Sequence, residues 1–277
     1  MGADEMNAAI NVLFHRYEHD LRFARALVAT NLKASLALRA SFCLQAAFMF
    51  LNNVFFFTTW LIFFDRFNDV RGWRLGDMTV LFGVVAAGAG LFAIFAGGSQ
   101  QLARMIVDGE LDPLLAQPKS PLLQSVGSRS VASGWGDLAT GVVFLGIAVS
   151  HHPAALPVAV LAALCSATVF VASAVLIHSL AFWLGRMETL ARQVWEFQLT
   201  FGLYPASLFT GLLKLFLFTV IPAGFVGYLP ADLVRDPGWL LAGALLAGTA
   251  AYAAFAFVVF HRGLRWYESG NRFGGVW

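Results

Sequence analysis

Three ionisable side chains lie inside or beside long apolar runs, where a charge could move a proton or bind an ion. Asp137 and Glu196 are the carboxylates nearest to such sequence, and His178 lies within the run that ends near residue 184. Ionisable groups in an apolar medium are costly, so both carboxylates are candidates for a transport pathway. Solvation at a surface is an equal alternative for them, and a hydrogen-bonded core histidine is the favoured interpretation of His178.

The pair His151-His152 could bind a metal ion, because imidazole is a common ligand. No cysteine or carboxylate lies beside the pair and Pro153 follows it, so a tight turn is favoured over a metal site. The sequence also lacks His-Glu-x-x-His and Gly-x-Ser-x-Gly, and no lysine follows a glycine as in a phosphate loop. We therefore expect no enzyme activity in this chain, and no catalytic, cofactor or metal site.

The composition is that of a membrane protein. Of the 277 residues, 59% are hydrophobic and 12% are charged, whereas soluble domains carry about 25% charged residues. The 27 phenylalanines and 8 tryptophans indicate that much of the surface contacts the lipid bilayer. A net charge of +2 gives no reason to expect a nucleic-acid partner. Cys43 and Cys165 lie in apolar runs and are expected to be small buried hydrophobes.

The apolar runs predict an all-α integral membrane protein with a single domain over residues 1–277. A transmembrane helix needs about 20 apolar residues, and six runs approach or exceed that length. They are residues 41–64, 78–97, 131–150, 154–184, 190–208 and 238–261. The second run contains small residues that permit close helix packing: Gly83, Ala86, Ala87, Gly88, Gly90 and Gly97.

Residues 1–40 predict a cytoplasmic amphipathic helix that lies in the headgroup plane before the first span. Apolar residues recur at steps of three and four, at Phe14, Tyr17, Leu21, Ala24 and Val28. The opposite face is polar and mostly basic, with His15, Arg16, Glu18, His19, Arg22 and Arg25. This pattern is typical of interfacial helices. An ordinary helix that packs on a partner is the alternative.

The distribution of Lys and Arg predicts the orientation. The larger share lies in residues 1–40, in the 98–130 connection, after the fourth span and after the last span. Fewer lie in the connections of the other side. Because positive residues are enriched in cytoplasmic loops, both termini and the 98–130 loop are expected in the cytoplasm. The protein would then cross the cell membrane six times.

Within the 98–130 loop, residues 109–121 form the most polar stretch of the chain. Arg104, Asp108, Glu110 and Asp112 come just before the apolar pair Leu114-Leu115. A loop that only turned the chain could be shorter, since helix connections often take about 2–8 residues. A solvated loop is the simpler interpretation. A segment that docks on another protein is the alternative.

Residues 209–230 are expected to form a re-entrant hairpin at the outer side, before the last span. Tyr204-Pro205 can end one helix, and Pro222 breaks the next segment. Lys214, between apolar residues, must extend to the surface or line a wet cavity. In the rival arrangement residues 211–228 form a full span and residues 190–209 lie along the inner surface.

Two motifs resemble those of type-2 ABC transporter permeases, in the branch of short stand-alone permeases with about six spans. The first is residues 109–115 with Pro118 and Leu122. The second comprises Tyr204-Pro205, Phe209, Leu213-Lys214, Phe218, Ile221-Pro222, Phe225, Tyr228 and Pro230-Ala231. The resemblance covers nearly the whole chain. Where the family most often carries arginine this chain has Lys214, which keeps the charge but loses the planar guanidinium fork.

This resemblance implies the permease subunit of an ATP-driven exporter that moves an amphipathic or hydrophobic substrate outward by alternating access. Its partners would be a second permease, identical or homologous, and ABC ATP-binding subunits that carry ATP and Mg. A coupling helix would fall near residues 100–107, with Arg104, Asp108, Glu110 and Asp112 at the docking surface. Tyr204, Pro205, Lys214 and Pro222 would belong to the outer gate.

Two other functions remain open. An ion-coupled secondary transporter needs ionisable groups in mid-membrane and usually two related halves, but the sequence shows no internal repeat. A membrane assembly factor that transports nothing is the third possibility. Four aromatic residues are expected to anchor the protein at the membrane interface rather than to stack on a substrate: Trp183, Trp195, Trp266 and Tyr267.

Overall fold

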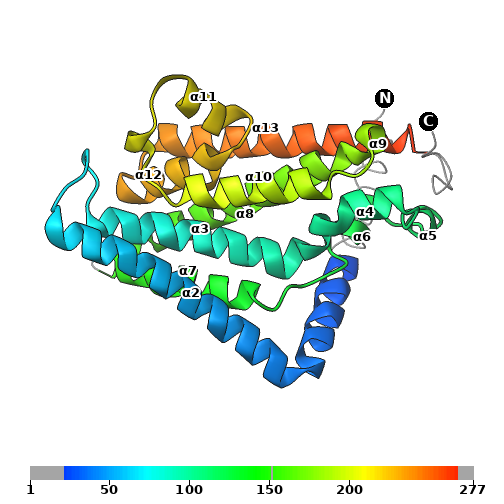
Figure 1. The fold of residues 1–277 in the computed structure, drawn as a ribbon, viewed down its shortest axis with the longest axis horizontal. Helices are drawn as coiled ribbons and strands as arrows, with labels where there is room; N and C mark the ends of the chain where they lie inside the picture. Colours follow the sequence, from blue (N-terminus) through cyan, green and yellow to red (C-terminus); the bar gives the residue numbers. More distant parts are fainter. Residues whose placement is uncertain (1–21, 151, 268–277) are drawn as a thin grey trace, which may run out of the picture.

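The computed structural model describes residues 22–150 and 152–267, which are mostly helical. The longer helices are α2 (Arg39–Arg66), α3 (Leu75–Ala96), α7 (Gly134–Val149), α8 (Leu156–Ser179), α10 (Glu188–Gly202) and α13 (Trp239–Leu264). Figure 1 shows α3, α7, α8, α10 and α13 lying lengthwise beside one another, with α2 inclined along α7. The predicted all-helical fold is confirmed.

Within the described residues, four helical segments are long and apolar enough to cross a membrane: Arg39–Arg66, Leu75–Val107, Pro153–Leu184 and Trp239–Leu264. A fifth is possible if Gly211–Thr219 and Gly224–Arg235, which are bent by 75°, form one span. Helix α7 is apolar but has only 16 residues, and α10 has 15. These findings support a multi-pass membrane protein, and the number of six crossings stays a prediction.

Helix α3 is the centre of the bundle, with 89% of its most apolar window buried. Glycines let the neighbouring helices approach it closely. A Cβ atom on Gly134 of α7 would lie 2.6 Å from Cβ of Ala93, and one on Gly141 would lie 2.5 Å from the backbone N of Ala87. Added carbons at Gly88 and Gly90 of α3 would collide with α8 and α7. The close packing predicted from small residues is therefore confirmed.

Helices α2 and α13 form the outside of the bundle. Only 11% of the apolar window of α2 and 22% of that of α13 are buried. Large apolar side chains on α2 are correspondingly exposed, with 67% of Phe48 and 72% of Phe55 accessible. Such a surface is stable only against lipid or another apolar surface.

The connections gather at the two ends of the bundle (Figure 1). One end holds η1 (Gly97–Gln101), α4 (Leu102–Val107), α5 (Asp112–Leu115), α6 (Pro121–Val126), α9 (Ala181–Leu184) and the end of α13. The other holds residues 67–74, α11 (Gly211–Thr219), the π-helical turn η4 (Gly224–Tyr228) and α12 (Leu229–Arg235). The segments richer in Lys and Arg thus share one end, which is the arrangement that the predicted orientation requires.

Residues 22–37 are helical, and a break at Leu38 separates them from α2. Ala24 and Val28, two members of the predicted apolar face, are half-buried, while Arg22 and Arg25 are exposed. The side chain of Asn31 donates a hydrogen bond of 2.6 Å to the carbonyl oxygen of Gly127. Phe14, Tyr17 and Leu21 lie outside the described residues, so the interfacial helix of residues 1–40 stays a prediction.

Candidate functional site

A cavity of about 320 Å³ lies between α2, α3, α7 and α10, and is called the membrane groove below. Its walls are mostly apolar and aromatic, with Phe56 from α2, Phe82 from α3 and Trp195 from α10. The polar atoms that reach it come from a few residues, Asn52, Asn53, Gln100, Ser133 and Asp137. Concave, mainly apolar sites with a few polar groups are typical of small-molecule binding.

Asp137 is the ionisable residue of the membrane groove. It lies in the first turn of α7, and only 8% of it is accessible. The side-chain amide of Asn53 donates hydrogen bonds to Oδ1 of Asp137 at 2.8 Å and to the hydroxyl of Thr140 at 3.3 Å. The structure therefore places one predicted pathway carboxylate at a cavity and does not support its solvation at a surface. The other, Glu196, is exposed on α10 outside this lining.

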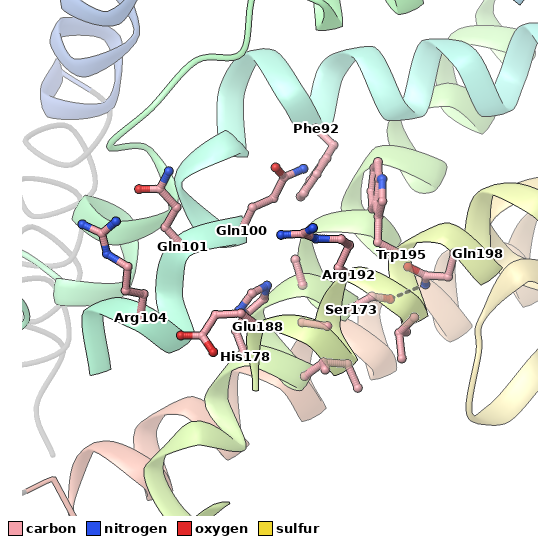
Figure 2. A pocket seen from close by; sticks show the side chains of 14 residues that line it. Phe92, Gln100, Gln101, Arg104, Ser173, His178, Glu188, Arg192, Trp195 and Gln198 are labelled. Carbon is pink, nitrogen blue, oxygen red and sulfur yellow. Dashed lines mark hydrogen bonds between the residues drawn. The ribbon is translucent and has the colours of Figure 1, made fainter. Parts of the chain in front are cut away.

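A second cavity of about 350 Å³, the polar vestibule, lies at the end of the bundle where α4 begins. Figure 2 shows Gln100, Gln101 and Arg104 on one side of it, with Glu188 and Arg192 of α10 facing them. Helix α10 is amphipathic, which lets it present charged side chains here and apolar ones to its neighbours. Both signs of charge therefore line the vestibule.

Trp195 forms part of the wall of both cavities. Its ring stacks on Phe92 with 4.7 Å between centroids, and its centroid lies 4.8 Å from that of Phe170. These contacts give no support to the prediction that Trp195 anchors the protein at the membrane interface. The tertiary contacts of α10 with α3 and α8 turn this side chain inward, where it separates the membrane groove from the polar vestibule.

Gln198, which the sequence did not single out, is a buried polar contact between helices. Only 1% of it is accessible, and its amide donates a 2.6 Å hydrogen bond to the hydroxyl of Ser173 on α8 (Figure 2). That hydroxyl lies 3.3 Å from the hydroxyl of Tyr252 on α13. A single glutamine in the middle of the predicted 190–208 span gives no sequence signal that separates this role from an exposed one.

His178 has a structural partner. Its Nδ1 accepts a hydrogen bond of 3.3 Å from the backbone N–H of Ala103. Ala103 lies in the first turn of α4, where backbone N–H groups have no partner within the helix. The favoured interpretation, a hydrogen-bonded core histidine, is confirmed, and the contact fixes α4 to the end of α8.

The exposed side chains of Arg104, Asp108 and Glu110 form a cluster, called the α4 surface below. Arg104 lies 3.1 Å from Oε1 of Glu110 and 3.6 Å from Oδ2 of Asp108. Gly109, with φ of +75°, turns the chain after α4 and brings Glu110 back toward Arg104. The structure thus brings together three of the four residues that the sequence assigned to docking.

The opposite face of α4 is buried. Leu102 and Ala103 are inaccessible, and Ile106 is 2% accessible. They belong to an apolar cluster that includes Val175 of α8 and Ala181 of α9. A helix anchored on one face and charged on the other can transmit a force from a docked protein to the bundle.

Asp112, the fourth residue, has a different partner. The hydroxyl of Tyr267, three residues beyond the end of α13, donates a 2.8 Å hydrogen bond to its Oδ1. Burial, and then the neighbouring carboxylate, raise the pKa of Tyr267 above that of an ordinary tyrosine. The hydroxyl therefore stays protonated at neutral pH and ties α13 to the loop after α4.

The residues assigned to an outer gate share one end of the bundle but do not form one site. Pro205 is buried just after α10, and the ring of Tyr204 contacts Trp60 with 5.5 Å between centroids. Pro222 is buried in the break between α11 and η4, whereas Lys214 is exposed on α11. The 75° bend fits either a broken span or a re-entrant loop.

Arg235, which the sequence did not single out, connects α3, α12 and the 67–74 connection at this end of the bundle. Its guanidinium bonds Asp77 of α3 at 2.7 Å and Asp232 of α12 at 3.0 Å. It also lies over the ring of Trp73, 4.3 Å from the centroid. Asp77 lies 158 residues from Arg235 in the sequence, so no local pattern reveals the contact between α3 and α12.

The comparison with protein families gives one match. Residues 50–271 match the model of the family described as ABC-2 family transporter protein, which covers the chain from α2 to the end of α13. Comparisons with curated proteins and with solved structures gave no significant match. Members of such a family are membrane permeases that work with an ABC ATP-binding subunit, as the resemblance of the two sequence motifs implied. The chain therefore belongs to the ABC-2 transporter family.

Proposed function

We propose that this chain is the permease subunit of an ATP-driven exporter that moves an amphipathic or hydrophobic substrate outward by alternating access. The supporting observation is that Leu75–Val107 forms one helical segment of 33 residues. Its far end carries the charged α4 surface, and its central part forms a wall of the membrane groove. Docking of an ATP-binding subunit at Arg104 would therefore act directly on the most buried helix of the bundle.

In this proposal ATP and Mg are bound by the partner subunit, and this chain carries no cofactor of its own. Binding and hydrolysis of ATP would bias a rigid-body change between two arrangements of the helices. The α4 surface and the adjoining Asp112 would face the cytoplasm, as would both termini. Helices α7 and α10 would complete six crossings of the cell membrane. Residues 209–230 would form a re-entrant hairpin that caps the path on the outer side.

A second permease, identical or homologous, would close the path. Exposed polar side chains recur at helical spacing on α10, at Thr189, Gln193, Glu196 and Thr200. Such a stripe is costly against lipid, which favours a water-lined path or a protein neighbour on that side. Because α10 also borders the membrane groove, the stripe and the groove would face the second permease together.

The test is to co-express the chain with the ATP-binding protein encoded beside it and with any second permease encoded there. Co-purification in detergent and vanadate-sensitive ATP hydrolysis are measured. Arg104→Glu should lower both about tenfold or more, since like charges across an interface cost several kcal/mol. The double variant Arg104→Glu with Glu110→Arg can re-form the internal ion pair but not the interface, so it should stay defective. Arg66→Glu, an exposed reversal at the opposite end, is the control.

Unchanged co-purification and ATP hydrolysis in Arg104→Glu would refute the docking assignment. Rescue by the double variant would show that only the local ion pair matters. A chain that purifies alone, without ATP dependence, would favour an ion-coupled secondary transporter. The observation that favours this second candidate is the burial of Asp137 beside a cavity. Flux assays on Asp137, His178 and Glu196 variants would follow, and absence of any flux would leave an assembly factor.

A further inference from the structure

We propose that Asp137 is the recognition group of the membrane groove, and that the groove binds an amphipathic molecule carrying a positively charged group. This proposal rests on the proposed function, because it assigns a substrate class to the transport path. It adds a chemical selection that neither the family nor the path itself specifies. Four properties of the groove support it: the contacts of the carboxylate, the charge of the lining, the aromatic walls and the size.

The carboxylate of Asp137 is only partly satisfied by the protein. Oδ1 accepts the hydrogen bond from Asn53, whereas Oδ2 receives none from the part of the chain that the structure describes. A carboxylate has about four acceptor positions, and Asp137 has 8% of its surface accessible. Because Asp137 lines the membrane groove, a bound molecule in the groove can supply the missing partner.

The lining of the groove leaves the negative charge of Asp137 without a counter-charge. None of the residues that line it is Lys, Arg or His. Among the described residues, no ion pair to Asp137 is present. The nearby cations Arg104 and Arg192 line the polar vestibule instead, where Trp195 forms a shared wall. A buried carboxylate without a cation is costly, so a cationic ligand gains from pairing with it.

The walls fit the remainder of such a molecule. The rings of Phe56, Phe82 and Trp195 line the same cavity as the carboxylate. Aromatic faces attract cations within about 6 Å of the ring centroid, and they also favour burial of an apolar body. The volume of about 320 Å³ lies at the small end of ligand sites, which span about 300–1,000 Å³. The groove therefore accommodates a small molecule whose positive charge is accompanied by an apolar or aromatic body.

Tetraphenylphosphonium and tetraphenylborate test the proposal, since they share size and shape and differ in the sign of charge. Equilibrium binding of each ion is measured on the purified complex in nanodiscs of neutral lipid. After each ion's binding to protein-free nanodiscs of the same lipid is subtracted, we expect the phosphonium to bind in preference to the borate. Asp137→Asn keeps the side-chain volume and should weaken phosphonium binding about tenfold or more, because it removes the opposite charge next to the bound cation. Binding of the borate should not fall.

Two further variants separate recognition from folding. Asp65→Asn makes the same chemical change at an exposed position at the end of α2, and should leave phosphonium binding unchanged. Asp137→Glu keeps the negative charge on a side chain that is one methylene longer, so it should bind the phosphonium more tightly than Asp137→Asn does. Equal binding of the two ions, or equal phosphonium affinity with and without the Asp137 carboxylate, would overturn the proposal. Phosphonium binding in Asp137→Glu that is no tighter than in Asp137→Asn would overturn it as well.

Vanadate-sensitive ATP hydrolysis is measured on the same preparations. An active complex without phosphonium selectivity would refute the cationic substrate class alone and would leave the exporter standing. A preparation that selects the phosphonium but does not associate with an ATP-binding subunit would support recognition by Asp137 and refute the exporter. The two proposals therefore fail in distinguishable ways.

Discussion

Gly141 of α7 is the position where one added methyl group should change both the packing of the bundle and the placement of Asp137. A Cβ atom there would lie 2.5 Å from the backbone N and 2.6 Å from Cα of Ala87 on α3. Ordinary contacts are 3.4–4 Å, so α7 must move away from α3 by roughly 1 Å. Asp137 lies one turn away on the same helix and would move with it.

The change in the free energy of unfolding of Gly141→Ala is the sum of two opposing contributions. Alanine in place of glycine within a helix gains about 1 kcal/mol, whereas overpacking a close interface costs about 1–3 kcal/mol. Gly146, on the same helix, has no atom within 4 Å of an added Cβ. Gly146→Ala therefore shows the gain alone and is the matched control. Because the gain is common to both variants, it cancels in the comparison, and Gly141→Ala should be about 1–3 kcal/mol less stable than Gly146→Ala.

The assay is thermal challenge of the detergent-solubilised chain, followed by size-exclusion chromatography of the fraction that remains monodisperse. For a chain of this size, 1 kcal/mol corresponds to about 2–4 °C, so the apparent midpoints should differ by roughly 2–12 °C. Phosphonium binding should also weaken in Gly141→Ala and not in Gly146→Ala. Equal midpoints for the two variants would show that α3 and α7 do not approach as closely as described.

Two further predictions concern the ends of the bundle. Arg235→Ala should destabilise the chain by about 2–3 kcal/mol, because it removes the charge-assisted bond to Asp77 and the ring contact. Thermal challenge measures the loss, and an unchanged midpoint would contradict it. Tyr267→Phe should loosen the Asp112 loop by about 1 kcal/mol, visible as faster amide exchange there. The pKa of Tyr267 is raised above 10.0, so below pH 10 its hydroxyl keeps the proton that it donates to Asp112. This hydrogen bond is lost only as the pH rises through the higher pKa of the folded chain. Loss of the hydrogen bond near pH 8 would contradict the assignment.

The sequence by itself determined the membrane class, the helical fold and the place of the charged α4 surface. These follow from local information: the length of apolar runs, the spacing of small residues and the order of Arg104, Asp108 and Glu110 along one helix and its turn. The glycines of α3 also predicted close packing, because a missing side chain has the same consequence whichever helix approaches. The family could also be recognised from the sequence, because each of its two motifs lies within one short stretch of the chain.

Only the tertiary structure decided which polar residues meet. Asn53 and Asp137 are 84 residues apart, and Asp77 and Arg235 are 158 apart, so no local pattern connects them. Trp195 lies near the middle of an amphipathic helix, and its sequence position does not tell which face meets α3. Packing against Phe92 turned it inward and made it the wall between two cavities, whereas the next residue, Glu196, is exposed. Such burial depends on contacts between distant helices, which local composition and periodicity do not encode.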